Sequence, residues 1–248
     1  MYTNKIAKAV GCHPNTVRLY EQWGLIPPAK RSANGYRIYT QEHLDQMKLA
    51  RTALNTPWPG KAIRRSGTAI VLQAASGDLG GALESAYDHL TLIQSEKIQA
   101  ESVAELVARW VQGLPVEKTN RLFRIQDAAG YLQVSVDQLR NWERNGLLTV
   151  PRDPMNRYRL YGSEELSRAR VIRMLRNAGY SIMAILRMMI KINQDDSIDI
   201  KQALDTPGPY EDLPFAADRW LTTLNEMEER AKAMIKNLED RINPDKTG

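Results

Sequence analysis

Arginines and tyrosines recur along the 248-residue chain at one constant interval of 122 residues, in the pairs Arg18 and Arg140, Tyr36 and Tyr158, and Arg37 and Arg159. Arginine presents a fixed fork of N–H donors that matches phosphate oxygens and other acceptor groups. The same interval holds for Gly24 and Gly146 and continues without a gap over some fifty residues. The repeat predicts two copies of one module that share their basic chemistry.

Charge is distributed unevenly between the modules and the segments that follow them. Residues 1–65 carry a net charge of +8 and residues 123–191 carry +6, whereas residues 66–122 carry −3 and residues 192–248 carry −6. Because positive charge gathers in both modules, the pattern favours a polyanion as their partner. Chance segregation of solvated surfaces is the alternative.

Few residues have the types and spacing that catalysis or metal binding requires. The three histidines are scattered, and no cysteine or carboxylate cluster has metal-ligand spacing. No Ser/His/Asp set or glycine-rich phosphate loop stands out, so we expect no enzyme, no cofactor and no metal. Cys12 is the single cysteine; it excludes an internal disulfide, favours a reducing compartment, and is interpreted as a small buried residue.

No apolar run is long enough to span a bilayer, and the first residues lack the apolar core of a signal peptide. We therefore expect a cytoplasmic protein with no membrane partner.

Each module begins with a pattern of helix, tight turn and helix. Ile6–Val10 suits a short amphipathic helix, and Pro14 suits the first position of a second helix, where a missing N–H costs nothing. In the second copy Ser135 and Gln138 have the spacing of a capping box. Gly24 and Gly146 are then expected to end these helices in the left-handed conformation.

A hairpin is expected next. Asn34-Gly35 is a strong two-residue turn signal between Lys30-Arg31-Ser32 and residues 36–39. Alternation places Tyr36 and Ile38 on one face of the hairpin, with Arg37 and Tyr39 on the other. The second copy has Asn156-Arg157 at the turn, so a different shape is expected there. Further helices are expected to open at Thr40 and Ser163, with helix corners at Pro57-Trp58-Pro59 and Gly179-Tyr180-Ser181.

These strings resemble the DNA-binding domain of MerR-type transcriptional regulators. The resemblance rests on Thr-Val-Arg-Leu-Tyr-Glu, Gly-Leu-Ile-Pro-Pro and Asn-Gly-Tyr-Arg-Ile-Tyr between Tyr2 and Tyr39, and residues 123–191 are similar to a second, more diverged copy. An ordinary member of the family has one such domain and dimerises. The resemblance implies a mainly α fold with two winged helix-turn-helix domains, each followed by a long helix of coiled-coil type.

Contacts to DNA are expected from the recognition helices and the wings. Residues near the N-terminus of a recognition helix read base edges, while basic groups hold phosphates. The resemblance gives Arg18 and Arg140 the role of recognition-helix arginine and Arg37 and Arg159 that of wing arginine. At positions where the family often has a phosphate-binding tyrosine, this chain has Leu19 and Asn141. The remaining expected contacts are the readers Asn15, Thr16, Asp137 and Gln138, the second recognition helix's Asn141, and the wing residues Lys30, Arg31, Tyr36, Arg152, Arg157 and Tyr158. Apolar core positions on the opposite face of these helices are Val17, Tyr20, Leu139 and Trp142.

Two long helices complete the pattern. Apolar residues step by four and three through Trp220, Leu224, Met227, Ala231, Met234 and Leu238, as in a coiled-coil seam. For the earlier helix, about Leu79 to Val111, the expected apolar side comprises Leu83, Tyr87, Leu90, Ile93, Val103, Val107 and Val111. The expected domains are 1–77, a helix at 78–112, a linker at 113–122, a second domain at 123–191, a connecting segment at 192–217 and a helix at 218–242.

The leading hypothesis is a bacterial, nucleoid-associated regulator of transcription. It would bind double-stranded DNA at two non-identical half-sites, distort the promoter, and act with RNA polymerase there. We expect the two long helices to pair antiparallel within one chain as an intramolecular pseudo-dimer. The alternatives are a homodimer with four modules and a tail that packs only on its own module. Two other functions stay open: a DNA-architectural or recombination accessory factor, and a ligand-sequestering protein that uses Trp110, Tyr210 and Trp220.

Overall fold

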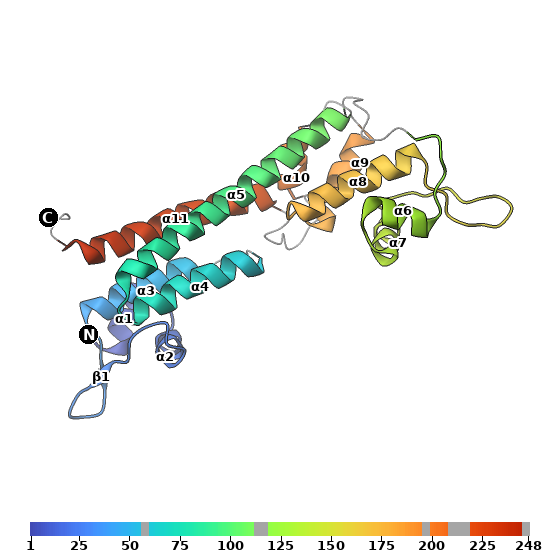
Figure 1. Ribbon diagram of the computed structural model, residues 1–248. Helices are drawn as coiled ribbons and strands as arrows, with labels where there is room; N and C mark the ends of the chain where they lie inside the picture. The colour runs from blue at the N-terminus through green and yellow to red at the C-terminus, as the bar shows by residue number, and fades with distance from the viewer. Residues whose placement is uncertain (56–59, 112–118, 195–198, 208–218, 245–248) are drawn as a thin grey trace. The chain divides into compact units, whose positions relative to one another are not determined.

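The computed structural model describes residues 1–55, 60–111, 119–194, 199–207 and 219–244, and the fold is mainly α-helical as predicted (Figure 1). None of the described helices is long and apolar enough to cross a membrane. Contacts divide the chain into two units, Met1–Ser95 with Leu224–Gly248, and Glu96–Thr223. Each unit therefore holds one module together with part of each long helix.

The helices of the first unit are α1 (Thr3–Ala9), α2 (Pro14–Gln22), α3 (Gln41–Leu54) and α4 (Lys61–Ala75), with the first part of α5 (Leu79–Val111) and most of α11 (Trp220–Ile242). The N-terminus of α2 has Pro14 at its first position, and His13 Nδ1 accepts the backbone N–H of Asn15. Gly24 follows the helix with a φ of 71°, a conformation that glycine adopts without strain. The predicted helix-turn-helix is thus confirmed in this module.

The first wing is a two-stranded antiparallel sheet of β1 (Lys30–Arg31) and β2 (Arg37–Ile38). Its register pairs Lys30 with Ile38 and Arg31 with Arg37. Gly35 turns between the strands at a φ of 78°. Tyr36 and Ile38 are exposed while Tyr39 is 1% exposed, which confirms the expected alternation of faces.

The second unit contains α6 (Ile125–Leu132), α7 (Val136–Arg144), α8 (Ser163–Asn177), α9 (Ile182–Ile192) and α10 (Ile200–Asp205). The capping box at the start of α7 is present: Gln138 N donates to Ser135 Oγ, and Ser135 N donates to Gln138 Oε1. Two isolated antiparallel bridges, Phe123 with Tyr161 and Arg152 with Arg159, take the place of paired strands in the second wing. The expected difference in shape between the wings is therefore confirmed.

The N-terminal cap of α8 is a glycine. α8 begins at Ser163 as predicted, but Gly162 occupies the cap position, and its N–H donates to Glu165 Oε2. Ser163 Oγ instead donates to the carbonyl of Thr119 and accepts its N–H, each at 2.8 Å. The Ser163 side chain thus bonds the backbone of the segment before the second module and does not cap α8.

The expected apolar side of α5 is wrong in part. Tyr87 is 48% exposed, where its hydroxyl reaches the exposed Glu239 on α11, and the buried side of α5 consists mainly of smaller residues. The buried positions of α5 are Ala82, Ala86, His89, Ile93, Ala100, Ala104 and Val107. On α11 all six predicted seam residues are buried, so that pattern is confirmed.

Within the first unit α5 and α11 run antiparallel (Figure 1). Tyr87 OH donates to Glu239 Oε1 at 2.9 Å, and Gln94 Nε2 donates to Glu228 Oε1 at 3.4 Å. The core of this unit combines Val17, Tyr39 and Met47 of the module with Met234 and Leu238 of α11.

Several expectations fall outside the described residues. These are the corner at residues 57–59, most of the linker at 113–122, and the part of the connecting segment that includes Tyr210. At the other corner, Gly179 has a φ of 95° and Ser181 caps α9, as expected. Cys12 is half-buried against the core, and this burial raises the pKa of its thiol.

Candidate nucleic-acid interface

The first turn of α2 presents three of the predicted contacts to solvent. Asn15 and Arg18 are exposed and Thr16 is half-buried. Arg18 Nη1 donates to Asn15 Oδ1 at 3.2 Å, so the two side chains lie together on the outer face of the helix. Val17 is fully buried and Tyr20 is 8% exposed, which confirms them as core residues and fixes the rotation of α2.

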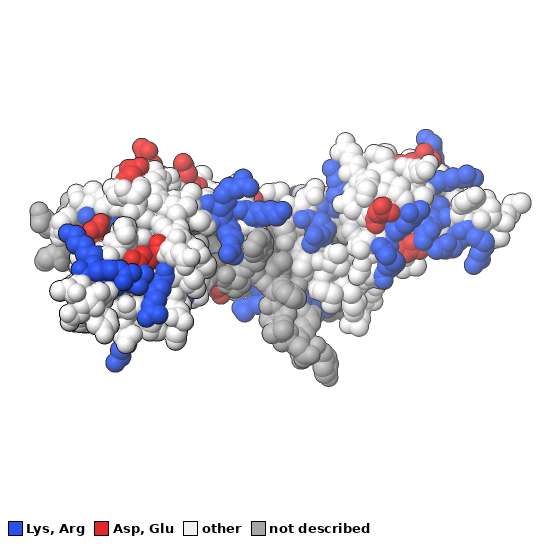
Figure 2. Space-filling model, turned by 90° about the horizontal axis from the view of Figure 1, so that it is seen from below, with Lys and Arg blue, Asp and Glu red and all other residues white. Residues whose placement is uncertain are grey.

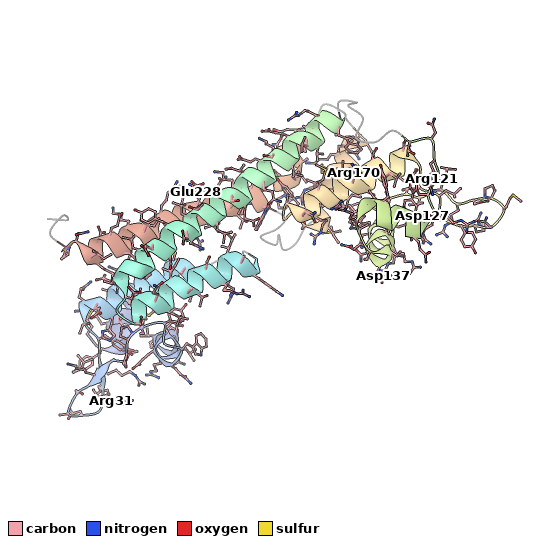
Figure 3. All side chains as sticks on the ribbon, in the orientation of Figure 1. Arg31, Arg121, Asp127, Asp137, Arg170 and Glu228 are labelled. Atoms are coloured by element: carbon pink, nitrogen blue, oxygen red, sulfur yellow. The ribbon has the colours of Figure 1, made fainter. Side chains whose placement is uncertain are left out.

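The first turn of α7 repeats this arrangement with a carboxylate. Arg140 Nη1 donates to Asp137 Oδ1 at 3.3 Å, and the Asp137 side chain is 88% exposed. Figure 3 labels Asp137 on α7. Gln138 is drawn back toward Ser135 by the capping box, so its Oε1 is occupied. Leu139 and Trp142 are buried as predicted.

The wing arginines Arg37 and Arg159 are held against the recognition helices. Arg37 Nε donates to Glu21 Oε2 at 2.6 Å, and Arg159 Nε donates to Glu143 Oε2 at 2.6 Å. Glu21 and Glu143 are themselves 122 residues apart, and we call each such pair a wing tether. These arginines therefore connect helix and wing, and about a third of each side chain stays exposed.

Sequence reasoning missed the tether glutamates. Glu21 also accepts the N–H of Ala29 at 3.2 Å and the hydroxyl of Tyr39 at 3.3 Å, while Glu143 accepts Arg152 at 3.3 Å. The signal was available, because both glutamates belong to the strings that repeat at 122 residues. A carboxylate that recurs in a basic module is a candidate partner for a recurring arginine.

The tyrosines beside the tethers keep their protons over the ordinary pH range. Burial is the first cause that raises the pKa of Tyr39, and the Glu21 carboxylate adds to it. Burial and then Glu143 raise the pKa of Tyr161 to about 12. A neutral hydroxyl can donate to the carboxylate, as Tyr39 does to Glu21.

The outer surfaces of the wings carry the remaining predicted contacts. In the first wing Lys30, Arg31 and Tyr36 are exposed, Arg31 Nη1 donates to the carbonyl of Gly35, and the Tyr36 ring meets Tyr2 edge-on at 6.3 Å. Figure 3 labels Arg31 on this wing. An open groove lies between this wing and the start of α1, and Arg18 of α2 and Tyr36 of the wing are among its lining residues.

In the second wing Arg157 stands where the first wing has Gly35. Its φ is 63°, a left-handed conformation that costs about 1–2 kcal/mol for a residue with a side chain. Exposed Tyr158 lies under the guanidinium of Arg124, 4.9 Å from the ring centroid. Arg152 is exposed and pairs with Glu143.

Leu19 and Asn141, which stand where the family often has a phosphate-binding tyrosine, differ in exposure and in their contacts. Leu19 is 40% exposed, whereas Asn141 is half-buried, and Asn145 Nδ2 donates to its side-chain oxygen at 3.3 Å and its backbone carbonyl at 2.7 Å. Asn141 therefore accepts hydrogen bonds at the C-terminal end of α7.

Lys and Arg side chains gather on the face of each unit that Figure 2 shows. Among the described residues no group of three or more His, Cys, Asp or Glu side chains is placed to hold a metal ion. Each unit thus combines an exposed helix start, a basic wing and a tether between them. This is the arrangement of a winged helix-turn-helix protein.

The chain matches the sequence pattern described as MerR HTH family regulatory protein over residues 1–66 and 123–191, which is more than half of its length. The chain belongs to this family, with two tandem domains.

Similarity to curated proteins is confined to a short region. A transcriptional regulator of Haemophilus influenzae, the ZntR homolog, is 49% identical over 47 residues, which are 19% of this chain and 35% of that protein. The regulator CueR of Escherichia coli O6:H1 is 45% identical over 53 residues, 21% of this chain and 39% of CueR. CueR of Vibrio cholerae is 47% identical over 49 residues, 20% and 35% of the two chains. The chain thus spans about two fifths or less of these relatives, and no solved structure matches it.

Proposed function

We propose that this protein is a cytoplasmic, sequence-specific regulator of transcription that binds double-stranded DNA through both modules and is not an enzyme. The observation that carries the proposal is the repeated surface at the start of α2 and α7. In both, an exposed arginine and an exposed Asn or Asp lie together at the helix start, where recognition helices meet base edges. The curated relatives carry names of transcriptional regulators.

The wings supply the phosphate contacts in this proposal. Each tether fixes a basic wing beside its recognition helix, so helix and wing meet the duplex as one body. The left-handed Arg157 supports such a role, because a strained residue in place of glycine suggests that its side chain is needed. Lys30 and Arg31 offer equivalent charges in the first wing.

We further propose that one chain does the work of a dimer. Each module packs on the long helix that follows the other module. In the first unit α11 reaches α3, where Arg241 Nη1 donates to Gln46 Oε1 at 2.8 Å, and Arg230 Nη1 donates to the carbonyl of Asn55. In the second unit Tyr180 OH donates to the carbonyl of Ala100 on α5.

This exchange of helices supports the pseudo-dimer over a homodimer. The seam of α5 in the first unit is occupied by α11 of the same chain, so a second copy would have to displace it. Two different recognition helices would then face two non-identical half-sites. Distortion of promoter DNA between the half-sites, with RNA polymerase as a partner there, completes the proposal.

Selection of binding sites from a random duplex library provides the operator for the test. Arg18→Ala and Arg140→Ala should each weaken binding to it by about 1–3 kcal/mol, the range for specific base contacts. Affinity should also fall steeply with salt concentration, because several phosphates are neutralised.

Arg109→Ala is the matched control, since Arg109 is exposed on α5 and belongs to neither module. It should leave affinity for the selected operator unchanged. If the library yields no enriched sequence, or if the double variant of Arg18 and Arg140 binds as tightly as the parent, DNA recognition through these helices is wrong.

A further inference from the structure

Asn15 and Asp137 occupy the same place in the two recognition helices. Each is the second residue of its helix, and they lie 122 residues apart. In each helix the arginine three residues later donates to the side-chain oxygen, at 3.2 Å in α2 and 3.3 Å in α7. The geometry is shared, but the chemistry of the outward-facing group differs.

The difference follows from the contact with arginine. A guanidinium has donors and no acceptor, so the Asn15 amide can only turn its oxygen toward Arg18. The Asn15 Nδ2 group, with two donor hydrogens, is then left to face a ligand. Asp137 has two oxygens, and while one accepts from Arg140 the other remains an acceptor.

Base edges in the major groove can also be divided into those that present a hydrogen-bond acceptor and those that present a donor. Guanine O6 and thymine O4 are acceptors, whereas cytosine N4 and adenine N6 are donors; N7 is an acceptor in both purines, so it does not distinguish guanine from adenine. A donor on α2 therefore matches a keto base, and an acceptor on α7 matches an amino base. If Asp137 faced guanine or thymine, its negatively charged oxygen would lie against another acceptor, which is unfavourable.

We infer that Asn15 selects guanine or thymine in one half-site, and that Asp137 selects cytosine or adenine at the corresponding position of the other. This inference rests on the proposed function and adds the chemical class of base to it. The operator would then be asymmetric at this position, even where its other positions are palindromic.

Two neighbouring features support a reading role for Asp137. DNA phosphates repel a carboxylate, and Arg140 contacts only one oxygen of Asp137, so an exposed aspartate at the start of a recognition helix is unfavourable unless its second oxygen also meets a donor. Gln138, the next side chain that could reach a base, has its Oε1 held by Ser135 N. The acceptor that remains at the start of α7 is that of Asp137.

The test uses the full chain and its selected operator, with all four base pairs placed in turn at the corresponding position of each half-site. The parent should prefer the keto base in one half-site and the amino base in the other, each by about tenfold. Asp137→Asn should move the preference of the second half-site to the keto base, and Asn15→Asp should move that of the first half-site to the amino base.

Asp127→Asn is the matched control, because it makes the same change of charge on an exposed residue of α6 in the same module (Figure 3). It should tighten binding slightly on every sequence and leave base preference unchanged. If Asp137 only orients Arg140, Asp137→Asn will change affinity equally for all four bases, and the inference is overturned. Equal preferences in both half-sites of the parent also overturn it, whereas loss of all sequence selectivity in the parent would count against the proposed function itself.

Discussion

The two wings are built on the same tether but differ at their tips. The first pairs two short strands and turns at Gly35, while the second has only two bridges and turns at a strained Arg157. In both, a glutamate of the recognition helix holds a wing arginine at 2.6 Å. The contrast indicates that these winged modules keep the connection between helix and wing, whereas the tip can diverge.

The largest stability difference between the units is expected at two glycines that pack against the long helices, Gly179 in the second unit and Gly67 in the first. A Cβ added to Gly179 would lie 2.5 Å from the Trp220 indole, and the glycine has a φ of 95°. A Cβ added to Gly67 would meet His89 at an ordinary 3.6 Å. Gly179→Ala should therefore destabilise the protein by about 3 kcal/mol, from overpacking and backbone strain together.

Gly67→Ala is the comparison variant for this experiment. It lies inside α4 and should be neutral or stabilising by up to about 1 kcal/mol, the difference in helix propensity. Both variants can be compared with the parent by urea unfolding. A cost for Gly67→Ala as large as that for Gly179→Ala would show that the two units are packed alike at these contacts.

The tethers should differ in strength. Glu21 accepts three donors, from Ala29, Arg37 and Tyr39, and all three lose this acceptor when the carboxylate is removed. Glu21→Ala should cost about 2–3 kcal/mol, and Glu143→Ala about 1–2 kcal/mol, because Arg152 and Arg159 can turn to water. Double-mutant cycles with Arg37→Ala and Arg159→Ala would isolate each pair. A coupling energy near zero in both cycles would contradict the tether.

The wing tips should respond in opposite directions to exchange of their turn residues. Arg157→Gly removes left-handed strain and should stabilise the second unit by about 1 kcal/mol, while Gly35→Ala should destabilise the first by a similar amount. Arg157→Gly should at the same time weaken DNA binding if its side chain meets phosphate. An Arg157→Gly variant that is less stable than the parent would show that the turn is not strained.

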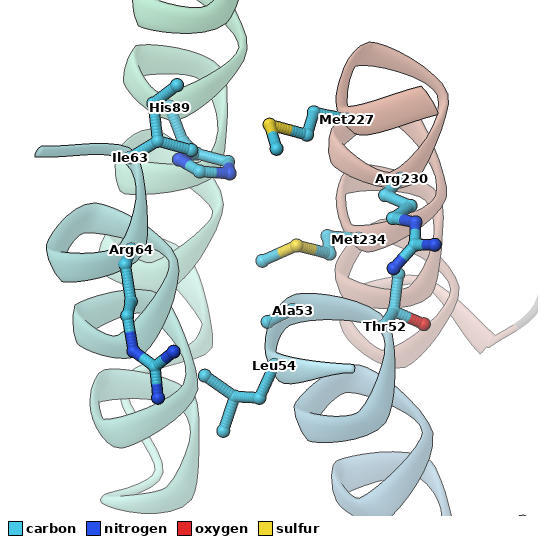
Figure 4. Close-up of a pocket in the computed structure, with 9 residues that line it drawn as sticks. All are labelled: Thr52, Ala53, Leu54, Ile63, Arg64, His89, Met227, Arg230 and Met234. Atoms are coloured by element: carbon cyan, nitrogen blue, oxygen red, sulfur yellow. The ribbon is translucent and has the colours of Figure 1, made fainter. Parts of the chain in front are cut away.

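A smaller difference is expected in acid. In the first unit His89 is 7% exposed, its Nδ1 lies 2.6 Å from Ser66 Oγ, and it borders a cavity of about 20 Å³ that Arg64 and Arg230 also line (Figure 4). Burial lowers the pKa of His89. The unfolded chain therefore binds this proton first, and stability is fully present above pH 6.5 and falls as the pH drops below it.

The size of this effect is limited to about 1.4 kcal/mol per pH unit, the maximum slope for one proton. Urea unfolding of the parent and of His89→Gln between pH 5 and 8 gives the measurement, with His13→Gln as the comparison for an exposed histidine whose Nδ1 caps α2. The His89→Gln variant should lose less stability than the parent below pH 6.5. Parallel profiles for all three proteins would rule out His89 as a source of the acid response.

Local helix-start and helix-end signals in the sequence predicted the helices of both modules well. Pro14, the capping box of Ser135, and the left-handed Gly24 and Gly146 each depend on a few adjacent residues, so they can be read without tertiary structure. The seam of α5 could not be read in this way. Apolar size favoured Tyr87, yet Ala82 and Ala86 are the buried residues of this stretch, and only the tertiary structure shows which side of the helix is covered.

For the candidate site, the sequence predicted which helices and wings carry the residues, but not the partners of each side chain. The repeat placed the candidate base-reading residues at the helix starts and the basic residues on the wings. It could not show that Gln138 caps its own helix or that Arg37 faces Glu21, because one side chain has several partners within reach and only packing decides among them. The turn of the second wing depends on contacts of Asp153 and Asn156 with nearby N–H groups, which give no simple sequence signal.

The number of chains in the free protein and on the operator decides whether one chain replaces a dimer. Light scattering coupled to size-exclusion chromatography should give a single mass near 28.1 kDa without DNA, and one chain per selected operator with it. Both recognition helices should be needed in that complex, so Arg18→Ala and Arg140→Ala should each weaken the one-to-one species. A stable assembly of twice that mass, bound to one operator through two copies of α2, would contradict the exchange of long helices within one chain.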